Sequence, residues 1–221
     1  MHRLIMLSRA YQMSSADQPD NTVKDVNNDC CWRFNRRRLT AEEIRDSFLA
    51  LAGTLDAKAG ERHPFPPEAQ WHYTQHRPFV EEYTSNKRSV YLMQQRFRKN
   101  QYLDLFDGAD TNATTAIRPV SQTPVQALWA MNSALAHEQA RNFAQRIFSA
   151  FSDERARIGY AFECALGRPA EAEETEDAQK YLGEVSAALA ETGLPEDQRP
   201  LAAFASFARV LLTSNELIFV D

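Results

Sequence analysis

Three aspartates lie close together in the middle of the chain, at Asp104, Asp107 and Asp110. Neighbouring carboxylates can act as a general acid and a general base, or can bind calcium through their oxygens. Their spacing does not match the calcium loop of an EF-hand. A turn also explains these residues, because Asp and Gly are common in turns. The sequence leaves a catalytic or metal-binding role and a turn role open.

Arginines gather just before an expected helix, at Arg36, Arg37 and Arg38. Positive charge is unfavourable there, so we expect carboxylates in the first turns of the helix to offset it. These carboxylates are Glu42, Glu43 and Asp46. Binding of an acidic ligand is the alternative. Nucleic acid is disfavoured, because 30 acidic residues outnumber 25 basic residues and the net charge is −5.

A second group of arginines lies around the aspartates, at Arg96, Arg98 and Arg118. An enzyme acting on a glycan or another anionic polymer could use Asp107, Asp110 and Arg118 for catalysis. The candidates for ligand binding are Arg36, Arg37, Arg38, Arg96 and Arg98. The chain has no Gly-x-Ser-x-Gly, His-Glu-x-x-His or Gly-x-x-x-x-Gly-Lys motif, so we favour a protein without catalytic activity.

His72 and His76 are four residues apart, a spacing that lets two ligands reach one metal ion on a helix. His63, Glu81 and Glu82 could complete such a site. The surrounding stretch contains four prolines, which disfavour a helix, so we predict exposed loop histidines and no metal site.

Aromatic residues occupy the same proline-rich stretch of the chain. They are Trp71, Tyr73, Phe79 and Tyr83. Aromatic rings on a stiff loop could stack on sugar rings. They could also pack over an edge of the core, which is the interpretation we favour.

Composition is that of an ordinary globular protein, with 221 residues, 43% hydrophobic and 25% charged. No run of about 18 apolar residues predicts a membrane span. The run from Leu4 to Leu7 is shorter than the roughly 7–15 apolar residues of an export signal. The three cysteines cannot all pair, and no Cys-x-x-Cys-His motif predicts covalent haem, so we expect no cofactor in this chain.

The hydrophobic pattern predicts a mainly α protein with a long irregular middle segment and at most one or two short strands. A helix over residues 1–13 is followed by a loop over residues 14–31. Thr40 and Glu43 have the spacing of a capping box, and apolar residues follow at helical spacing up to Leu55. Ser89–Leu92 is the best strand candidate, and residues 94–122 are expected to be largely irregular.

The second half of the chain predicts four helices. Thr123 and Gln126 form a second capping box, and the long amphipathic helix that follows is expected to bend near His137. Its apolar stripe is Val125, Leu128, Leu135, Phe143, Ile147 and Phe151. Ser152 caps the next helix, Gly167 ends it, and two helices follow. We treat residues 1–221 as a single domain, which could be subdivided into residues 1–122 and 123–221.

Three stretches resemble a C-terminal domain of unknown function, family 1553, found in large proteins of planctomycetes and related bacteria. They are residues 35–46 (NRRRLTAEEIRD), 123–128 (TPVQAL) and 211–221 (LLTSNELIFVD). Further matches are Arg88-Ser89-Val90-Tyr91, Phe106-Asp107 followed by Asp110, Arg118, Asn132, and Leu166-Gly167-Arg168-Pro169. The likeness spans nearly the whole chain.

The resemblance implies a mostly helical domain that accompanies a cytochrome-c-like domain and a second domain of unknown function. Haem c is then expected only in a separate upstream domain of the parent. Such proteins carry export signals, which implies a periplasmic or extracellular location, and they accompany the breakdown of complex polysaccharides. Family domains extend upstream of the position matching Met1, so the chain resembles an N-terminally truncated portion, and it carries no export signal of its own.

We therefore expect a non-catalytic module that interacts with the other domains of a multidomain parent and supports a haem-bearing neighbour. Polysaccharide is a further expected partner, and nucleic acid is not. The family supplies no catalytic residues. The alternative is the enzyme acting on a glycan or anionic polymer through the Asp and Arg residues of the middle segment.

Overall fold

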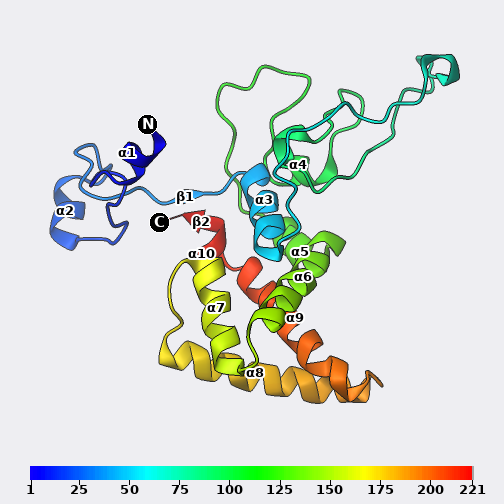
Figure 1. Ribbon diagram of the computed structural model, residues 1–221. Helices are drawn as coiled ribbons and strands as arrows, with labels where there is room; N and C mark the ends of the chain where they lie inside the picture. Colours follow the sequence, from blue (N-terminus) through cyan, green and yellow to red (C-terminus); the bar gives the residue numbers. More distant parts are fainter. Residues whose placement is uncertain (221) are drawn as a thin grey trace. The chain divides into compact units, whose positions relative to one another are not determined.

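The computed structural model describes residues 1–220. Contacts divide the chain into two compact units: Met1–Leu39 with the residues from Ile218 onward, and Thr40–Leu217. Helices predominate, and the described strands form one two-stranded sheet, which confirms the predicted mainly α class (Figure 1). That residues 1–221 form a single domain, or divide after residue 122, stays a prediction.

The smaller unit contains two short helices and one strand pair. These are α1 (His2–Met6), α2 (Pro19–Lys24), β1 (Arg37–Arg38) and β2 (Phe219–Val220). The strands are antiparallel, with Arg37 opposite Val220 and Arg38 opposite Phe219. The end of the chain therefore pairs with the arginine-rich stretch that precedes residue 40.

Asn28 organises the loop between α2 and β1. Its φ of 58° lies in the left-handed region, which Asn tolerates better than most residues. Its side-chain oxygen accepts from the backbone N–H of Trp32 at 2.8 Å, and its amide donates to the carbonyl of Arg33 at 2.8 Å. No buried apolar residue of the described chain belongs to residues 1–39, so polar bonds shape this loop.

Two sequence predictions for this unit were wrong in extent. The helix expected over residues 1–13 ends at Met6, because no partner covers its apolar side chains and short helices are marginal alone. The loop expected over residues 14–31 contains α2, which has Pro19 in its first turn, where a missing N–H costs no hydrogen bond.

The larger unit begins with α3 (Ala41–Ala52). The predicted capping box is present: the Glu43 N–H donates to Thr40 Oγ1 at 3.3 Å, and the Thr40 N–H donates to Glu43 Oε2 at 2.8 Å. The helix ends at Gly53, whose φ of 75° suits glycine, so Leu55 lies beyond the helix and not on its stripe.

Short elements occupy the segment between α3 and α5. They are the 3₁₀ turns η1 (Glu68–Gln70) and η2 (Ser89–Tyr91) and the helix α4 (Gln101–Leu105). The strand predicted at Ser89–Leu92 is therefore wrong. The Ser89 N–H donates to the Asp46 side chain, so it is not available for a strand ladder. The expectation that residues 94–122 are largely irregular is confirmed.

The long helix predicted after Thr123 is divided in two, α5 (Pro124–Asn132) and α6 (Ala134–Ala150). The capping box at Thr123 and Gln126 is confirmed. The break lies at Ser133 and not near His137. Ser133 has an extended ψ of 138°, and its side chain accepts from the Ala136 N–H, so it ends one helix and caps the next.

Four further helices complete the unit. They are α7 (Glu154–Leu166), α8 (Ala172–Glu191), α9 (Arg199–Leu212, preceded by the turn η3, Glu196–Gln198) and α10 (Asn215–Ile218). Asp153 caps α7 where Ser152 was expected, and the predicted stop at Gly167 is confirmed by its φ of 71°. Although α8 has 20 residues, across residues 1–220 no helix combines the length and apolarity needed to cross a membrane.

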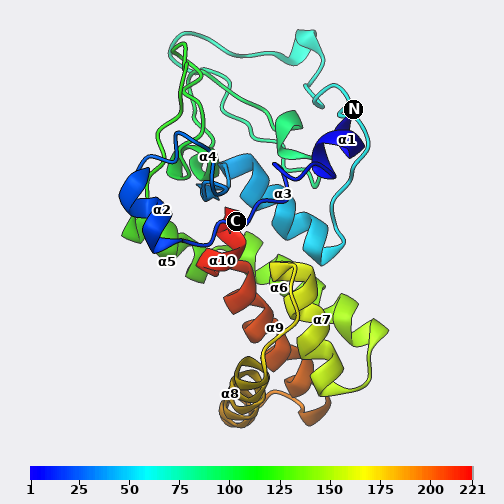
Figure 2. The same cartoon turned by 90° about the vertical axis from the view of Figure 1, so that its left-hand side faces the viewer.

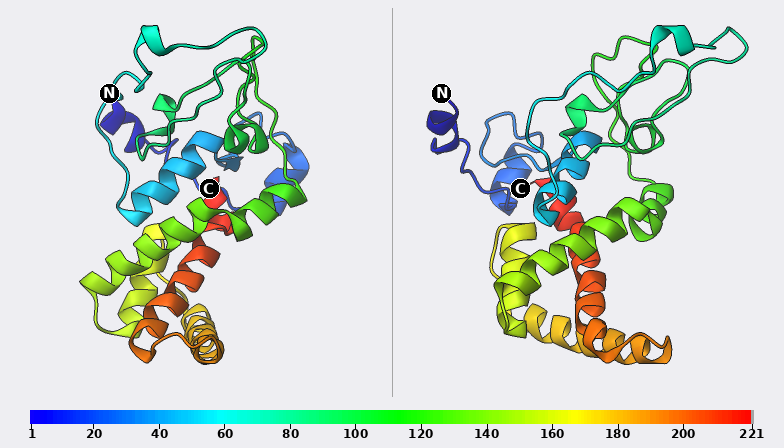
Figure 3. Two further views of the ribbon diagram at one scale, coloured as in Figure 1. Left: turned by 90° about the vertical axis from the view of Figure 1, so that its right-hand side faces the viewer. Right: turned by 45° about the vertical axis from the view of Figure 1, so that its right-hand side comes forward.

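The core lies where α3, α6 and α9 meet. Phe48 of α3, Phe143 and Ile147 of α6, and Phe204 and Leu212 of α9 are at most 1% exposed. Figures 2 and 3 show α9 crossing α6, with α8 lying across the ends of α7 and α9. The loops between α3 and α5 extend away from this core in the same views.

Replacing Phe143 by Ala should lower the free energy of unfolding by about 3–5 kcal/mol, because a buried ring is lost and a cavity remains. Phe97→Ala is the matched control: Phe97 is 84% exposed, and its loss should cost less than about 0.5 kcal/mol. Urea denaturation followed by circular dichroism measures both. Equal losses in the two variants would contradict this core.

Candidate functional site

One face of α3 binds the irregular segment through charged side chains. Glu42, Arg45 and Asp46 are three and four residues apart, so they share this face. Arg118 Nη1 donates to Glu42 Oε2 at 2.7 Å, and both side chains are partly exposed. This ion pair ties α3 to a loop 76 residues further along the chain.

Arg45 is buried and donates to the loop that contains η2. Its Nη1 lies 3.0 Å from the Lys87 carbonyl and 3.1 Å from Ser89 Oγ, and its Nη2 donates to the Ser85 carbonyl. Burial lowers the pKa of Arg45, while the neighbouring carboxylate of Asp46 opposes that shift. A buried guanidinium that bonds backbone carbonyls fixes the path of that loop.

Asp46 binds the same loop at Ser89. Its Oδ1 accepts from the Ser89 N–H at 2.8 Å and from Ser89 Oγ at 2.6 Å. Two stretches that carry the family resemblance, residues 35–46 and 88–91, therefore meet at one set of hydrogen bonds.

Asp107 forms a second polar centre, at the turn after α4. Its φ of 62° lies in the left-handed region. The N–H of Ser121 donates to Asp107 Oδ2 at 2.8 Å, and Ser121 Oγ lies 2.8 Å from Oδ1 and 2.9 Å from Oδ2. Gln126 Nε2 donates to Ser121 Oγ at 3.2 Å and to the Leu105 carbonyl at 2.8 Å. Both side-chain oxygens of Asp107 therefore accept hydrogen bonds from Ser121, in the segment that leads into α5.

An aromatic cluster lies beside this centre. The rings of Tyr102, Phe106 and Trp129 have centroids 4.9–5.2 Å apart. The Tyr102 hydroxyl donates to the Ala41 carbonyl at 2.6 Å, and burial raises the pKa of Tyr102. The cluster joins α3, α4 and α5.

The three candidates for catalysis bind three different partners. Asp107 binds Ser121, Arg118 binds Glu42, and Asp110 Oδ1 accepts from the N–H of Asn112 at 2.9 Å. The third aspartate of the group, Asp104, lies 3.1 Å from Lys99 Nζ. These contacts hold the loops together, and a catalytic role for the three candidates stays a prediction.

The arginines predicted to bind a ligand belong to both units. In the smaller unit, Arg36 Nε donates to Ser15 Oγ at 3.4 Å, and Arg37 and Arg38 form β1. All three have interactions within the protein. In the larger unit, Arg98 donates to the Val80 carbonyl and lies 3.8 Å from Glu82, while Arg96 is exposed. Their role in binding stays a prediction.

His72 and His76 lie on an exposed, non-helical stretch, so the helix needed to bring them to one metal ion is not present. In the described part of the chain, no three His, Cys, Asp or Glu side chains gather as metal ligands. The nearby aromatic rings pack on one another: the Tyr73 and Phe79 centroids are 5.0 Å apart, and those of Phe79 and Tyr83 are 6.3 Å apart.

Arg168 joins three helices at the other end of the larger unit. Its Nη1 and Nη2 donate to the two oxygens of Glu174 in α8, each at 2.7 Å. Its Nε and Nη2 donate to Glu216 of α10 at 2.5 and 3.0 Å. Arg168 therefore fixes the last helical turn of the larger unit to α8 through Glu216.

These bonds change the acidity of the partners. Hydrogen bonds to Glu174 and Glu216 raise the pKa of Arg168, and Arg168 lowers the pKa of Glu174 to about 2. Glu174 Oε2 also accepts from the Glu171 N–H at 2.8 Å, at the start of α8. The sequence named the Leu166–Pro169 stretch without predicting this arrangement.

The sequence also predicted the orientation of α5 wrongly. Gln126 points inward and is 4% exposed, whereas Val125, Leu128 and Met131 are 58%, 57% and 62% exposed. The amphipathic pattern placed Val125 and Leu128 in the core. Gln126 in the capping box was the available signal, because a long polar side chain there can reach back toward the preceding loop.

Residues 1–182 match the model of the family described as "Protein of unknown function (DUF1553)". No curated protein and no solved structure matches the chain.

Arg168→Met should lower the free energy of unfolding by about 1–2 kcal/mol, because one guanidinium serves two carboxylates that are partly screened by solvent. Arg155→Met is the control. Arg155 is exposed on α7 and bonds Gln179 at 3.4 Å, so its loss should cost less than about 0.5 kcal/mol. Chemical denaturation at neutral pH compares the two, and indistinguishable midpoints would refute the structural role of Arg168.

The stability supplied by Glu174 should depend on pH. Its pKa is about 2 in the folded chain and ordinarily 4.5, so the contribution is complete above pH 4.5 and disappears as the pH falls toward 2. Wild type should therefore be more stable than Glu174→Gln at neutral pH, and the two should converge in acid. Thermal melts of both proteins over this pH range provide the measurement. A difference that stays constant into acid would argue against the ion pair.

Proposed function

The chain belongs to the DUF1553 family, and from that premise we propose that it is a non-catalytic interaction module of an exported multidomain protein. In this proposal it supports a haem-bearing neighbouring domain. The parent acts in the periplasm or outside the cell, in the breakdown of complex polysaccharides. The cytochrome association, the location and the polysaccharide link follow from the family resemblance.

The observation that carries the proposal is the outward apolar face of α5. Val125, Leu128 and Met131 are three residues apart and lie along one side of the helix. Each is more than half exposed, while Gln126 on the opposite side is buried. Exposed apolar side chains that gather on one helix are typical of surfaces that bind another protein.

The outward orientation is enforced by polar bonds. If α5 turned its apolar face to the core, the Gln126 amide would lose the Leu105 carbonyl and Ser121 Oγ. Buried polar groups without partners cost about 1–3 kcal/mol each. The two backbone bonds of the capping box at Thr123 also set the start of the helix. The apolar face is therefore a stable feature of the surface and available to a partner.

An enzyme that uses the middle segment has weaker support. A general acid or base must reach the substrate, and the Asp107 oxygens are occupied by Ser121. Arg118 is likewise bound to Glu42. These contacts favour an architectural role for the residues that carry the family resemblance.

Leu128→Asp and Met131→Asp should each weaken binding of the chain to the haem-bearing domain of its parent by at least about tenfold, because a charge would enter an apolar interface. Isothermal titration of the separated domain against the chain measures the dissociation constant. Val23→Asp is the matched control: Val23 is 82% exposed on α2 and should leave binding unchanged.

Failure of the wild-type chain to associate at high micromolar concentration would contradict the interaction module. Equal weakening by Val23→Asp would show instead that added charge acts without regard to position, and would remove α5 as the contact surface.

A further inference from the structure

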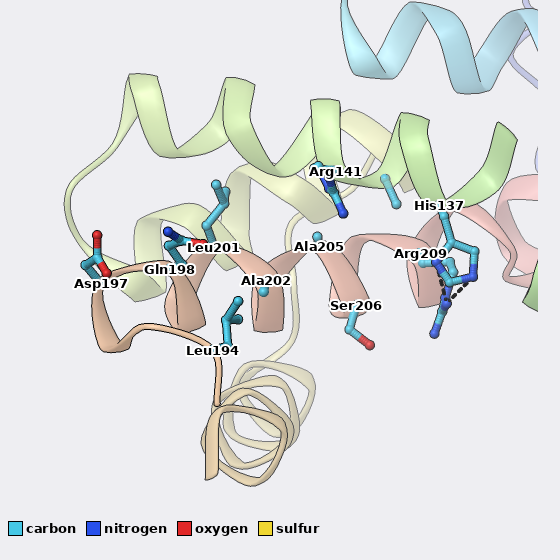
Figure 4. Close-up of a pocket in the computed structure, with 11 residues that line it drawn as sticks. His137, Arg141, Leu194, Asp197, Gln198, Leu201, Ala202, Ala205, Ser206 and Arg209 are labelled. Atoms are coloured by element: carbon cyan, nitrogen blue, oxygen red, sulfur yellow. Dashed lines mark hydrogen bonds between the residues drawn. The ribbon is translucent and has the colours of Figure 1, made fainter. Parts of the chain in front are cut away.

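A groove runs between α6 and α9 in the larger unit, and one end of it adjoins the last turn of α5 at the Met131 carbonyl. Its volume is about 480 Å³, and the connection between α8 and α9 forms one end of it (Figure 4). Sites for small molecules are typically about 300–1,000 Å³. The groove is therefore large enough for a ligand of modest size.

Basic side chains line the half of the groove away from that connection. His137 and Arg141 are four residues apart on α6, so they face the same way, and Arg209 comes from α9. Figure 4 shows His137 and Arg209 side by side and Arg141 pointing from α6 toward α9. Asp197 is the single acid among the described lining residues, and it lies at the opposite end.

Arg209 is held in place by His137 and by a backbone carbonyl. Its Nη1 lies 3.0 Å from His137 Nδ1 and 2.7 Å from His137 Nε2, and 3.5 Å from the Met131 carbonyl. His137 Nε2 also lies 3.0 Å from the Met131 carbonyl. Neither Arg141 nor Arg209 forms an ion pair within residues 1–220. Their charges remain available to an anion.

The middle of the groove is apolar. Leu194 and Leu201 line it, and Ala202 and Ala205 of α9 leave room because their side chains are small. From Leu201 to Arg209 the helix rises by about 12 Å, at about 1.5 Å per residue. Along this stretch a bound molecule would meet Leu201 and the two alanines, then Ser206, and the guanidinium groups of Arg141 and Arg209 in the other half of the groove.

From this geometry we propose that the groove binds an organic carboxylate with an apolar body. The carboxylate accepts hydrogen bonds from Arg209 and Arg141, whose planar groups match its two oxygens. The body lies against Leu194, Leu201 and the two alanines. The small headgroup suits two arginines, and the apolar wall distinguishes this ligand from a free inorganic anion.

Sodium octanoate tests the proposal, with octan-1-ol and inorganic phosphate as the other arms. Octanoate should bind the chain saturably, with amide shifts in nuclear magnetic resonance spectra at α6 and α9. Octan-1-ol lacks the charge and phosphate lacks the apolar body, so each should bind at least about tenfold more weakly, a difference of about 1.4 kcal/mol. This comparison uses the wild-type chain, so it does not depend on whether a variant folds.

Arg209→Met and Arg141→Met should each weaken octanoate binding by at least about tenfold. Arg155→Met, which removes an exposed arginine from α7, should not change it. The proposal is overturned if octanoate shows no saturation up to about 10 mM, if octan-1-ol or phosphate binds as tightly, or if the shifts lie outside α6 and α9.

Discussion

A single guanidinium group determines how the helices at one end of the larger unit meet. Arg168 follows Gly167, whose left-handed backbone ends α7, and it places two nitrogens on Glu174 and two on Glu216. Glu174 in turn accepts a hydrogen bond from the N–H of Glu171, the residue that precedes α8. The end of α7, the start of α8 and the α10 turn are thus coupled by charge-assisted bonds, which are stronger than neutral ones. α9 packs on α6 and on α8.

Side-chain hydrogen bonds also hold the middle segment, where regular structure is sparse. Long loops inside a compact unit lose much conformational entropy on folding, and their polar groups need partners. Helix side chains supply these partners here: Arg45 and Asp46 bind residues 85–89, and Glu42 binds Arg118. The β-prone residues 89–92 suggested a strand. The hydrogen bonds of this segment are made instead with charged side chains of α3.

Sequence patterns predicted what depends on neighbours along the chain. Both capping boxes, the stop at Gly167 and the mainly α class involve residues within a few positions of one another, so local chemistry determines them. The partners of Asp107 and Arg168 depend on residues 14 and 48 positions away, which the periodicity does not reveal. The groove beside His137 likewise needs α6 and α9 to be packed before its residues can be seen together.

The orientation of α5 shows how the hydrogen bonds of one buried side chain, Gln126, can leave apolar residues exposed on the opposite side of a helix. Gln126 has to reach Leu105 and Ser121, and a helix that turns this residue inward turns the positions on its opposite side outward. In α5 those positions are apolar. Trp129, on the inner side, keeps the helix attached through Tyr102 and Phe106, so the outward face is not needed for packing. A buried amide network that stabilises the fold and an exposed apolar face suited to a partner are therefore two consequences of the same constraint.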